Sequence, residues 1–203
     1  MLFSCKVTKN DYICISLILL DMIDEILSFN REFVRNKGYE PFATDKYPDK
    51  KIAIVSCMDT RLVELLPAAL GLRNGDVKII KNAGATITNP FDSTMRSLLI
   101  AVYELGVNEI MVIGHTGCGV QGMDADHMLG LMKERGVSHE HISLMEHCGI
   151  DLKRWLHGFD DVDAAMKETV DLIARHPLMP PSGVNVQGFV MDSYTGALRK
   201  IEV

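Results

Sequence analysis

Several patterns that mark large protein classes are missing from the sequence. There is no Cys-x-x-Cys pair anywhere in the 203 residues, so a four-cysteine structural zinc site is not indicated. The five cysteines are odd in number and irregularly spaced, which excludes the regular disulfide framework of small secreted domains. Thiols without partners fit a reducing compartment, and we therefore expect a cytoplasmic protein.

The chain also lacks a hydrophobic run long enough for a membrane. Its most apolar stretch, Tyr12 to Leu20, is far shorter than the roughly 20 residues that span a bilayer. Asp21 follows at once and there is no small-x-small cleavage pattern, so the stretch fits a signal peptide poorly. Residues 1–21 look unlike the rest, and we expect an N-terminal extension followed by a single domain over 22–203.

An excess of positive charge is absent as well. With 21 Lys and Arg against 27 Asp and Glu, the net charge is −6, which argues against nucleic acid and anionic membranes as partners. Hydrophobic residues make up 47 % and charged residues 24 %, as in ordinary soluble globular proteins.

Apolar runs of strand length alternate with segments of helical periodicity. This alternation predicts βαβ units, and hence an α/β fold with a mostly parallel central sheet flanked by helices. The last two strands are separated by turn residues and predict a C-terminal antiparallel hairpin at the sheet edge. The expected strands are 51–56, 77–80, 109–113, 184–191 and 197–203; the expected helices are 22–37, 62–70, 93–105 and 160–175, with a mixed helical region over 122–158 that breaks near Gly136 and Gly149.

Three of the expected strands end in unusual residue sets. These sets are Cys57-x-Asp59-x-Arg61, Lys81-Asn82-Ala83-Gly84 and His115-x-x-Cys118. The carboxyl ends of parallel strands lie at one edge of a sheet, where ligand crevices form, so we expect the three sets to meet. Gly117 and Gly119 allow the chain to bend tightly beside the imidazole and thiol.

Two thiols and one imidazole form the ligand set of a catalytic zinc. Three protein ligands leave the fourth position for water, whereas structural zinc is usually closed by four. The soft sulfur ligands of Cys57 and Cys118 disfavour magnesium and calcium. Zinc would lower the pKa of its water from 15.7 to about 7, and we expect one Zn²⁺ per chain, held by Cys57, His115 and Cys118.

Asp59 and Arg61 offer two ways to control the fourth position. Asp59 can accept the hydrogen of a zinc-bound hydroxide and so orient its oxygen, or it can ligate the zinc itself and close the site. Arg61 can decide between them, because its planar guanidinium pairs bidentately with a carboxylate and holds it off the metal. Taken singly, each of these residues is ordinary: a buried Cys is often structural, and an Asp–Arg pair is often a surface pair.

Taken together, the Cys57-x-Asp59-x-Arg61 and His115-x-x-Cys118-Gly119 motifs resemble the signature of beta-class carbonic anhydrases. The resemblance covers about residues 22–203. It implies zinc on Cys57, His115 and Cys118, an Asp59–Arg61 dyad, and a Gly119 amide that faces the substrate. It also implies reversible hydration of carbon dioxide to bicarbonate by zinc-bound hydroxide, in an obligate homodimer or a dimer of dimers.

The sequence leaves two alternatives open. A branch of the same family acts on carbonyl sulfide or carbon disulfide with the same ligands. A non-catalytic zinc or redox-sensing protein could use Cys57 and Cys118 as a reactive pair, although such a protein has no need of Asp59 and Arg61. Two positions also depart from the family: many members have Arg in place of Lys81, and members with a second, inhibitory bicarbonate site have Trp in place of Ile54.

Overall fold

The computed structural model describes the backbone of residues 9–202 and the side chains of residues 22–202. The chain divides into two compact units, Met1–Thr44 and Asp45–Val203. The expected extension over residues 1–21 falls outside the described side chains, and it stays a prediction.

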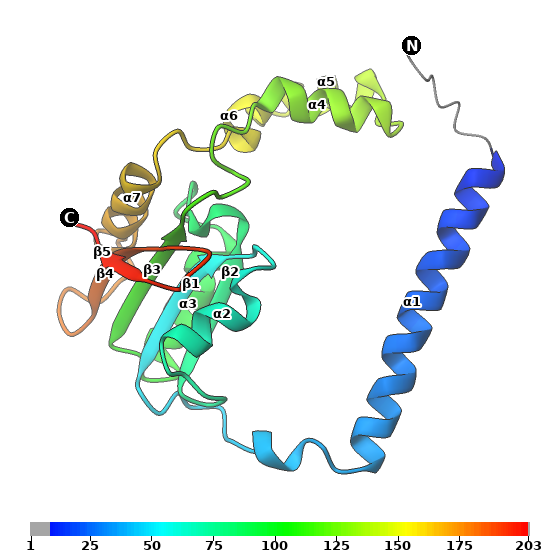
Figure 1. The fold of residues 1–203 in the computed structure, drawn as a ribbon. Helices are drawn as coiled ribbons and strands as arrows, with labels where there is room; N and C mark the ends of the chain where they lie inside the picture. Colours follow the sequence, from blue (N-terminus) through cyan, green and yellow to red (C-terminus); the bar gives the residue numbers. More distant parts are fainter. Residues whose placement is uncertain (1–8, 203) are drawn as a thin grey trace. The chain divides into compact units, whose positions relative to one another are not determined.

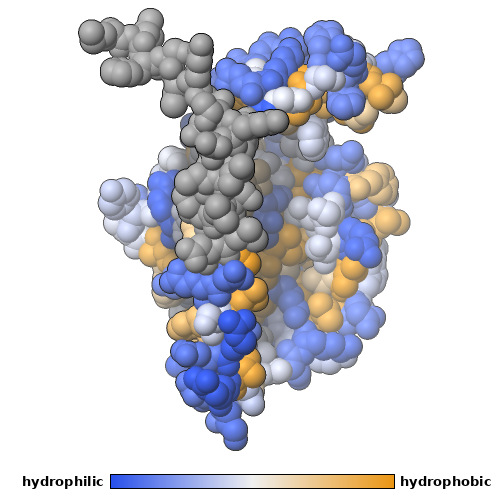
Figure 2. Space-filling view, turned by 90° about the vertical axis from the view of Figure 1, so that its right-hand side faces the viewer, coloured by the Kyte–Doolittle hydropathy of each residue, from blue (hydrophilic) through white to orange (hydrophobic). Residues whose placement is uncertain are grey.

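The first unit consists of a long helix and one short turn of 3₁₀ helix. Helix α1 (Lys9–Arg35) starts well before the expected residue 22, and η1 (Glu40–Phe42) follows it. Lys37 closes the helix in a left-handed conformation, with φ of 56°, and the Gly38 amide donates to the Phe33 carbonyl. The apolar side chains on the described part of α1 are largely exposed, and Figure 2 shows apolar atoms beside polar ones there; they include Met22, Ile23, Ile26, Leu27, Phe29 and Val34.

The second unit is built on a five-stranded sheet (Figure 1). The strands are β1 (Ile52–Cys57), β2 (Val77–Asn82), β3 (Glu109–His115), β4 (Asn185–Met191) and β5 (Leu198–Lys200). Their order is β2-β1-β3-β4-β5; the first four are parallel, and β5 runs antiparallel to β4. The predicted α/β fold with its C-terminal antiparallel hairpin is confirmed.

Helices cover both faces of this sheet. Helices α3 (Ser93–Tyr103) and α7 (Val162–Ala174) cover one face, and α2 (Leu62–Ala69) covers the other. The unit also contains η2 (Ala83–Ala85) after β2 and the helices α4 (Ala125–Glu134), α5 (His139–His147) and α6 (Leu152–Leu156), which extend away from the sheet (Figure 1). A polar side chain at the N-cap accepts a hydrogen bond from a first-turn amide and so satisfies one free donor of each helix from α3 onward. These caps are Asp92, Asp124, Ser138, Asp151 and Asp161.

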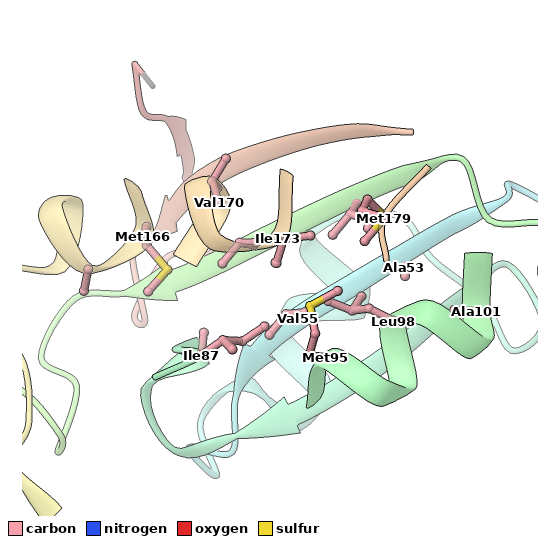
Figure 3. Close-up of a cluster of buried hydrophobic side chains, with 14 of the residues drawn as sticks. Ala53, Val55, Ile87, Met95, Leu98, Ala101, Met166, Val170, Ile173 and Met179 are labelled. Atoms are coloured by element: carbon pink, nitrogen blue, oxygen red, sulfur yellow. The ribbon is translucent and has the colours of Figure 1, made fainter. Parts of the chain in front are cut away.

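Alternation along β1 divides the core into two layers. Ala53 and Val55 point to the face that α3 and α7 cover, and Figure 3 shows Val55 beside Met95 and Leu98 of α3. Ile54 points to the opposite face, where α2 packs through side chains such as Leu66. Because both faces are covered, the central strands carry short runs of consecutive apolar residues, Ile52–Val55 in β1 and Ile110–Ile113 in β3.

The segment from α4 to α6 has a small apolar cluster of its own, and its helices are separated at the predicted breaks. Gly136 and Gly149 both adopt positive φ between successive helices. The buried members of the cluster are Ala125, Leu129, Ile142 and Leu156. Over the part of the chain that the structure describes, no helix has the length and apolar character needed to cross a membrane.

Candidate metal centre

The carboxyl ends of β1 and β3 bring two thiols and one imidazole together. Cys57 is the last residue of β1 and His115 the last residue of β3, so His115 lies within its strand and not just beyond it as expected. Cys118 follows three residues later. The ligand atoms of the three side chains all lie within 4.8 Å of one another, the two sulfurs are 3.8 Å apart, and all three residues are buried. The predicted convergence of these residues is therefore observed.

Two glycines shape the backbone around the sulfurs. Gly117 has φ of 61°, a left-handed conformation that turns the chain between His115 and Cys118. Gly84 has φ of 79° and directs its amide at the Cys57 sulfur, 3.4 Å away. A side chain at Gly84 would begin 3.0 Å from the Phe159 ring, so glycine is also required by packing.

One hydrogen bond fixes the form of the imidazole. The Nδ1 atom of His115 lies 3.0 Å from the Thr116 carbonyl oxygen, which can only accept, so Nδ1 carries the hydrogen. The Nε2 atom is then a lone-pair donor, and it is buried without a hydrogen-bond partner. A buried polar atom without a partner costs free energy unless something binds it. Together with the two sulfurs, it fits a borderline-soft metal ion such as zinc.

The two thiols differ in acidity. Burial raises the pKa of Cys57, but His115, the Gly84 amide and other neighbours outweigh it and lower the pKa to about 7. Burial raises the pKa of Cys118, and the adjacent Cys57 raises it further. Without a metal ion one thiol therefore ionises near neutrality and the other does not, and the pair avoids two adjacent negative charges.

Arg61 holds Asp59 by both carboxylate oxygens. Nε of Arg61 donates to Oδ1 at 2.9 Å and Nη2 donates to Oδ2 at 2.8 Å, while the Arg61 amide also donates to Oδ1 at 2.9 Å. The bidentate pair keeps the pKa of Asp59 far below its usual range, so the side chain is a carboxylate at neutral pH. The Gly117 carbonyl accepts from Nη2 at 2.8 Å, which ties the dyad to the loop carrying Cys118.

Asp59 lies next to the three-ligand group without belonging to it. Its Oδ2 atom is 3.8 Å from Nε2 of His115, the nitrogen available to a metal ion. Arg61 donates to both carboxylate oxygens of Asp59. Of the two arrangements expected for Asp59, the structure therefore has the one in which Arg61 holds the carboxylate away from the metal position. Lys81 holds the segment that carries Asp59 and Arg61 at both ends. Its Nζ atom donates to the Cys57 carbonyl at 3.2 Å and to the Leu62 carbonyl at 3.5 Å.

Gly119 lies exposed beside Cys118. It does not adopt positive φ, and a side chain there would meet no atom within 4 Å, so neither conformation nor packing explains glycine at this position. Its expected contact with substrate stays a prediction. Sequence reasoning missed Thr116 and Ser193, which hydrogen-bond to each other and to the site. Hydroxyl residues in loops are common, so the sequence carried no signal for them.

A sizeable cavity among the described residues lies apart from the metal centre. It measures about 640 Å³ and lies between the loop after η2, α7 and the segments flanking α4 to α6; its lining includes Thr86, Val120, His157, Phe159 and Glu168. None of the three ligand residues lines it. The converging donors, not the volume, therefore identify the site of chemistry.

Comparison with known proteins places this arrangement in a family. The sequence profile of the family described as "Carbonic anhydrase" matches residues 52–198. A Bacillus subtilis protein named "Putative carbonic anhydrase YtiB" is 51 % identical over 179 residues, covering 88 % of this chain and 95 % of that protein. An Acidithiobacillus thiooxidans protein named "Carbon disulfide hydrolase" is 30 % identical over 159 residues, covering 74 % of this chain and 77 % of its own length.

A solved structure of a beta-carbonic anhydrase has the same fold as this chain. The beta-carbonic anhydrase isoform I from Trichomonas vaginalis has a TM-score of 0.79 at 33 % identity, covering 88 % of this chain and 96 % of that one. The chain therefore belongs to the beta-class carbonic anhydrase family. The expectations of family and of an enzyme are confirmed, and the structure contains a Cys–His–Cys group that could hold a metal ion.

Proposed function

We propose that the protein catalyses the reversible hydration of carbon dioxide to bicarbonate and a proton, with one Zn²⁺ per chain. The observation that carries the proposal is the combination of three buried ligands with an Arg-held carboxylate 3.8 Å from Nε2 of His115. A protein that only stored zinc would have no use for that carboxylate.

Cys57, His115 and Cys118 would hold the zinc. When bound, the ion supplies a hydroxide at neutral pH and attracts the oxygen of the substrate. His115 is already in the tautomer that presents Nε2, and the Gly84 amide stabilises the Cys57 thiolate by donating to its sulfur. Three protein ligands leave a fourth position open.

Asp59 would orient the attacking oxygen. As a carboxylate it can only accept a hydrogen, so it fixes which lone pair of that oxygen points toward carbon. Arg61 holds the carboxylate in place and keeps it ionised. If Arg61 released it, the same carboxylate could close the site as a fourth ligand, so Arg61 governs both states. Gly119 would offer its backbone amide to the substrate oxygen.

Carbonyl sulfide or carbon disulfide hydrolysis is the second candidate. It is supported by relatives named "Carbon disulfide hydrolase" that are about 30 % identical to this chain. The same ligands and the same carboxylate would serve, because each substrate is a linear molecule with an electrophilic carbon. The higher identity to YtiB favours carbon dioxide.

We also propose a cytoplasmic homodimer, or a dimer of dimers, that binds neither nucleic acid nor membrane. The free thiols of Cys57, Cys118 and Cys148 support a reducing compartment. The exposed apolar side chains of α1 support association with a second copy, because contiguous exposed apolar surface commonly marks an interface. Sedimentation velocity tests the assembly: a monomer at micromolar concentration would contradict it.

The direct test of the reaction is a stopped-flow hydration assay on protein with measured zinc content. We expect carbon dioxide turnover between pH 7 and 9 that scales with zinc occupancy. Parallel assays with carbonyl sulfide and carbon disulfide distinguish the second candidate by higher turnover. Full zinc occupancy without turnover of any of the three would reject both, and would leave a zinc-binding or redox-sensing protein.

A further inference from the structure

The turn between β4 and β5 reaches the metal centre through one buried hydroxyl. Ser193 is 7 % exposed, although the neighbouring Tyr194 is 91 % exposed. Its Oγ atom donates to the Thr116 carbonyl at 2.9 Å and lies 3.3 Å from Nη1 of Arg61, which can only donate. A single hydroxyl therefore serves both the loop after His115 and the guanidinium of the dyad.

The Thr116 carbonyl connects this hydroxyl to a metal ligand. The same oxygen accepts from Nδ1 of His115 at 3.0 Å, so the imidazole and Ser193 share one acceptor. Thr116 is held at its other groups too, because its amide donates to the Met191 carbonyl and its hydroxyl accepts from the Ser193 amide. Ser193 thus lies between the bond that orients His115 and the bond that holds Arg61.

The turn itself is fixed firmly enough to hold a side chain in place. The Asp192 carboxylate accepts from the Tyr194 amide, the Thr195 amide and the Thr195 hydroxyl, at 2.8 to 3.0 Å. Gly196 packs so closely on α2 that a side chain would begin 2.7 Å from Ala69. Helix α2 begins directly after Arg61, so the turn and the dyad are held against the same helix.

We propose that Ser193 is a positioning residue of the metal centre: its hydroxyl holds Arg61, and through Arg61 the Asp59 carboxylate, in register with His115. The Arg61 guanidinium has five donor hydrogens, and three of them go to Asp59 and Gly117. The remaining amino group, Nη1, donates to the Ser193 hydroxyl. Without this bond Nη1 loses its protein acceptor, and the guanidinium can rotate about its pairing with Asp59. The inference rests on the proposed hydration reaction, since it assigns Ser193 a part in orienting the attacking oxygen.

The test compares Ser193→Ala with Tyr194→Phe, which removes a hydroxyl from the same turn on a side chain that is 91 % exposed. We expect Ser193→Ala to lower kcat for hydration about 5-fold to 10-fold, with KM and zinc content unchanged, as for loss of one hydrogen bond of ordinary strength. Tyr194→Phe should leave kcat within 2-fold. In an Asp59→Asn background, Ser193→Ala should cause no further fall, because the residue acts through Asp59.

A second readout does not require activity. In the metal-free protein, NMR exchange of the Arg61 Nε hydrogen with water should accelerate in Ser193→Ala and not in Tyr194→Phe. If the unaltered protein hydrates no carbon dioxide, the proposed reaction fails and the exchange measurement alone decides the positioning role. Unchanged exchange, an unchanged kcat, or the same fold-loss in the Asp59→Asn background would overturn the proposal.

Discussion

Strand β1 and helix α1 are both rich in apolar residues, and they use them in opposite ways. In β1, five of the six residues are buried, and the strand ends at Cys57. Along the described part of α1, apolar side chains such as Ile26 and Phe29 are 67 % and 72 % exposed. An apolar pattern therefore shows which face of a helix or strand tends to be buried. Burial itself requires another helix or sheet that packs on that face.

The difference has a functional side. Since β1 is fixed on both faces and bonded to β2 and β3, the residues at its end are placed accurately enough to meet His115. Along the described part of helix α1, most side chains are exposed, and the Phe33 ring contacts the Phe42 ring. We therefore expect substitutions at the end of β1 to act on chemistry, and substitutions on α1 to act on assembly.

Removal of a ligand at the end of β1 should have the largest effect. Cys57→Ala leaves two protein ligands, and we expect zinc content to fall from one per chain to near zero, with loss of hydration. Cys148→Ala is the matched control, since Cys148 is an exposed free thiol. Elemental analysis after gel filtration gives the zinc content. Retention of one zinc in Cys57→Ala would show that the three-ligand assignment is wrong.

Acid should weaken zinc binding at the same strand ends. Cys57 has a pKa of about 7. Burial raises the pKa of Cys118, and the neighbouring Cys57 raises the pKa of His115 against the opposite effect of burial. Zinc binds only the deprotonated forms, so each protonated ligand costs about tenfold in apparent affinity per pH unit below its pKa, and affinity rises with pH. Between pH 8 and pH 6 we expect a fall of roughly 1,000-fold or more, about tenfold from Cys57 and about 100-fold from Cys118. Competition with a chromophoric chelator measures it, and a flat profile would contradict proton-linked ligation.

Two Asp–Arg pairs of similar geometry allow the dyad to be tested. Asp59→Asn should keep the zinc and lower turnover about 100-fold, because the amide has no charge and only one accepting oxygen, so it cannot both pair with Arg61 at two atoms and accept a further hydrogen. Asp163 is paired with Arg199 at 2.9 and 2.7 Å, far from the ligands in sequence, and Asp163→Asn should change turnover less than about 2-fold. Equal effects of the two substitutions would remove the special role of Asp59.

The smallest effect is expected on α1. Ile54 is 1 % exposed, and Ile54→Ala should cost about 2–5 kcal/mol in free energy of unfolding because it leaves a cavity. Ile26→Ala should change that free energy by less than about 0.5 kcal/mol in dilute protein. At higher concentration the cost of Ile26→Ala should grow, because a dimer interface stabilises by mass action. Urea titrations at two protein concentrations decide it; a cost independent of concentration would remove α1 from the proposed interface.

Local patterns predicted most of the fold because each strand and helix carries its own periodicity. The helix ending before Gly106 and the breaks at Gly136 and Gly149 follow from residue type alone. The start of α1 could not be predicted from residue type alone. Helix starts depend on capping and on neighbouring residues, and the residues before Met22 carry no clear amphipathic pattern. Strand ends were also uncertain: ladder bonds with β4 extend β3 through Gly114 to His115.

The sequence by itself determined which residues could serve as metal ligands and as the dyad, because thiol, imidazole, carboxylate and guanidinium are properties of residue type. Tertiary structure alone decided which way each group is held. The Gly84 amide that donates to the Cys57 sulfur lies 27 residues away along the chain, and the Gly117 carbonyl that accepts from Arg61 lies 56 residues away. The His115–Thr116 and Asp59–Arg61 bonds join near neighbours in sequence, but the folded loops hold them in these geometries. Ser193 shows the same limit, since its hydroxyl lies 132 residues from Arg61 along the chain and 3.3 Å from it in space. Hydrogen bonds form between neighbours in space, and only the folded chain defines those neighbours.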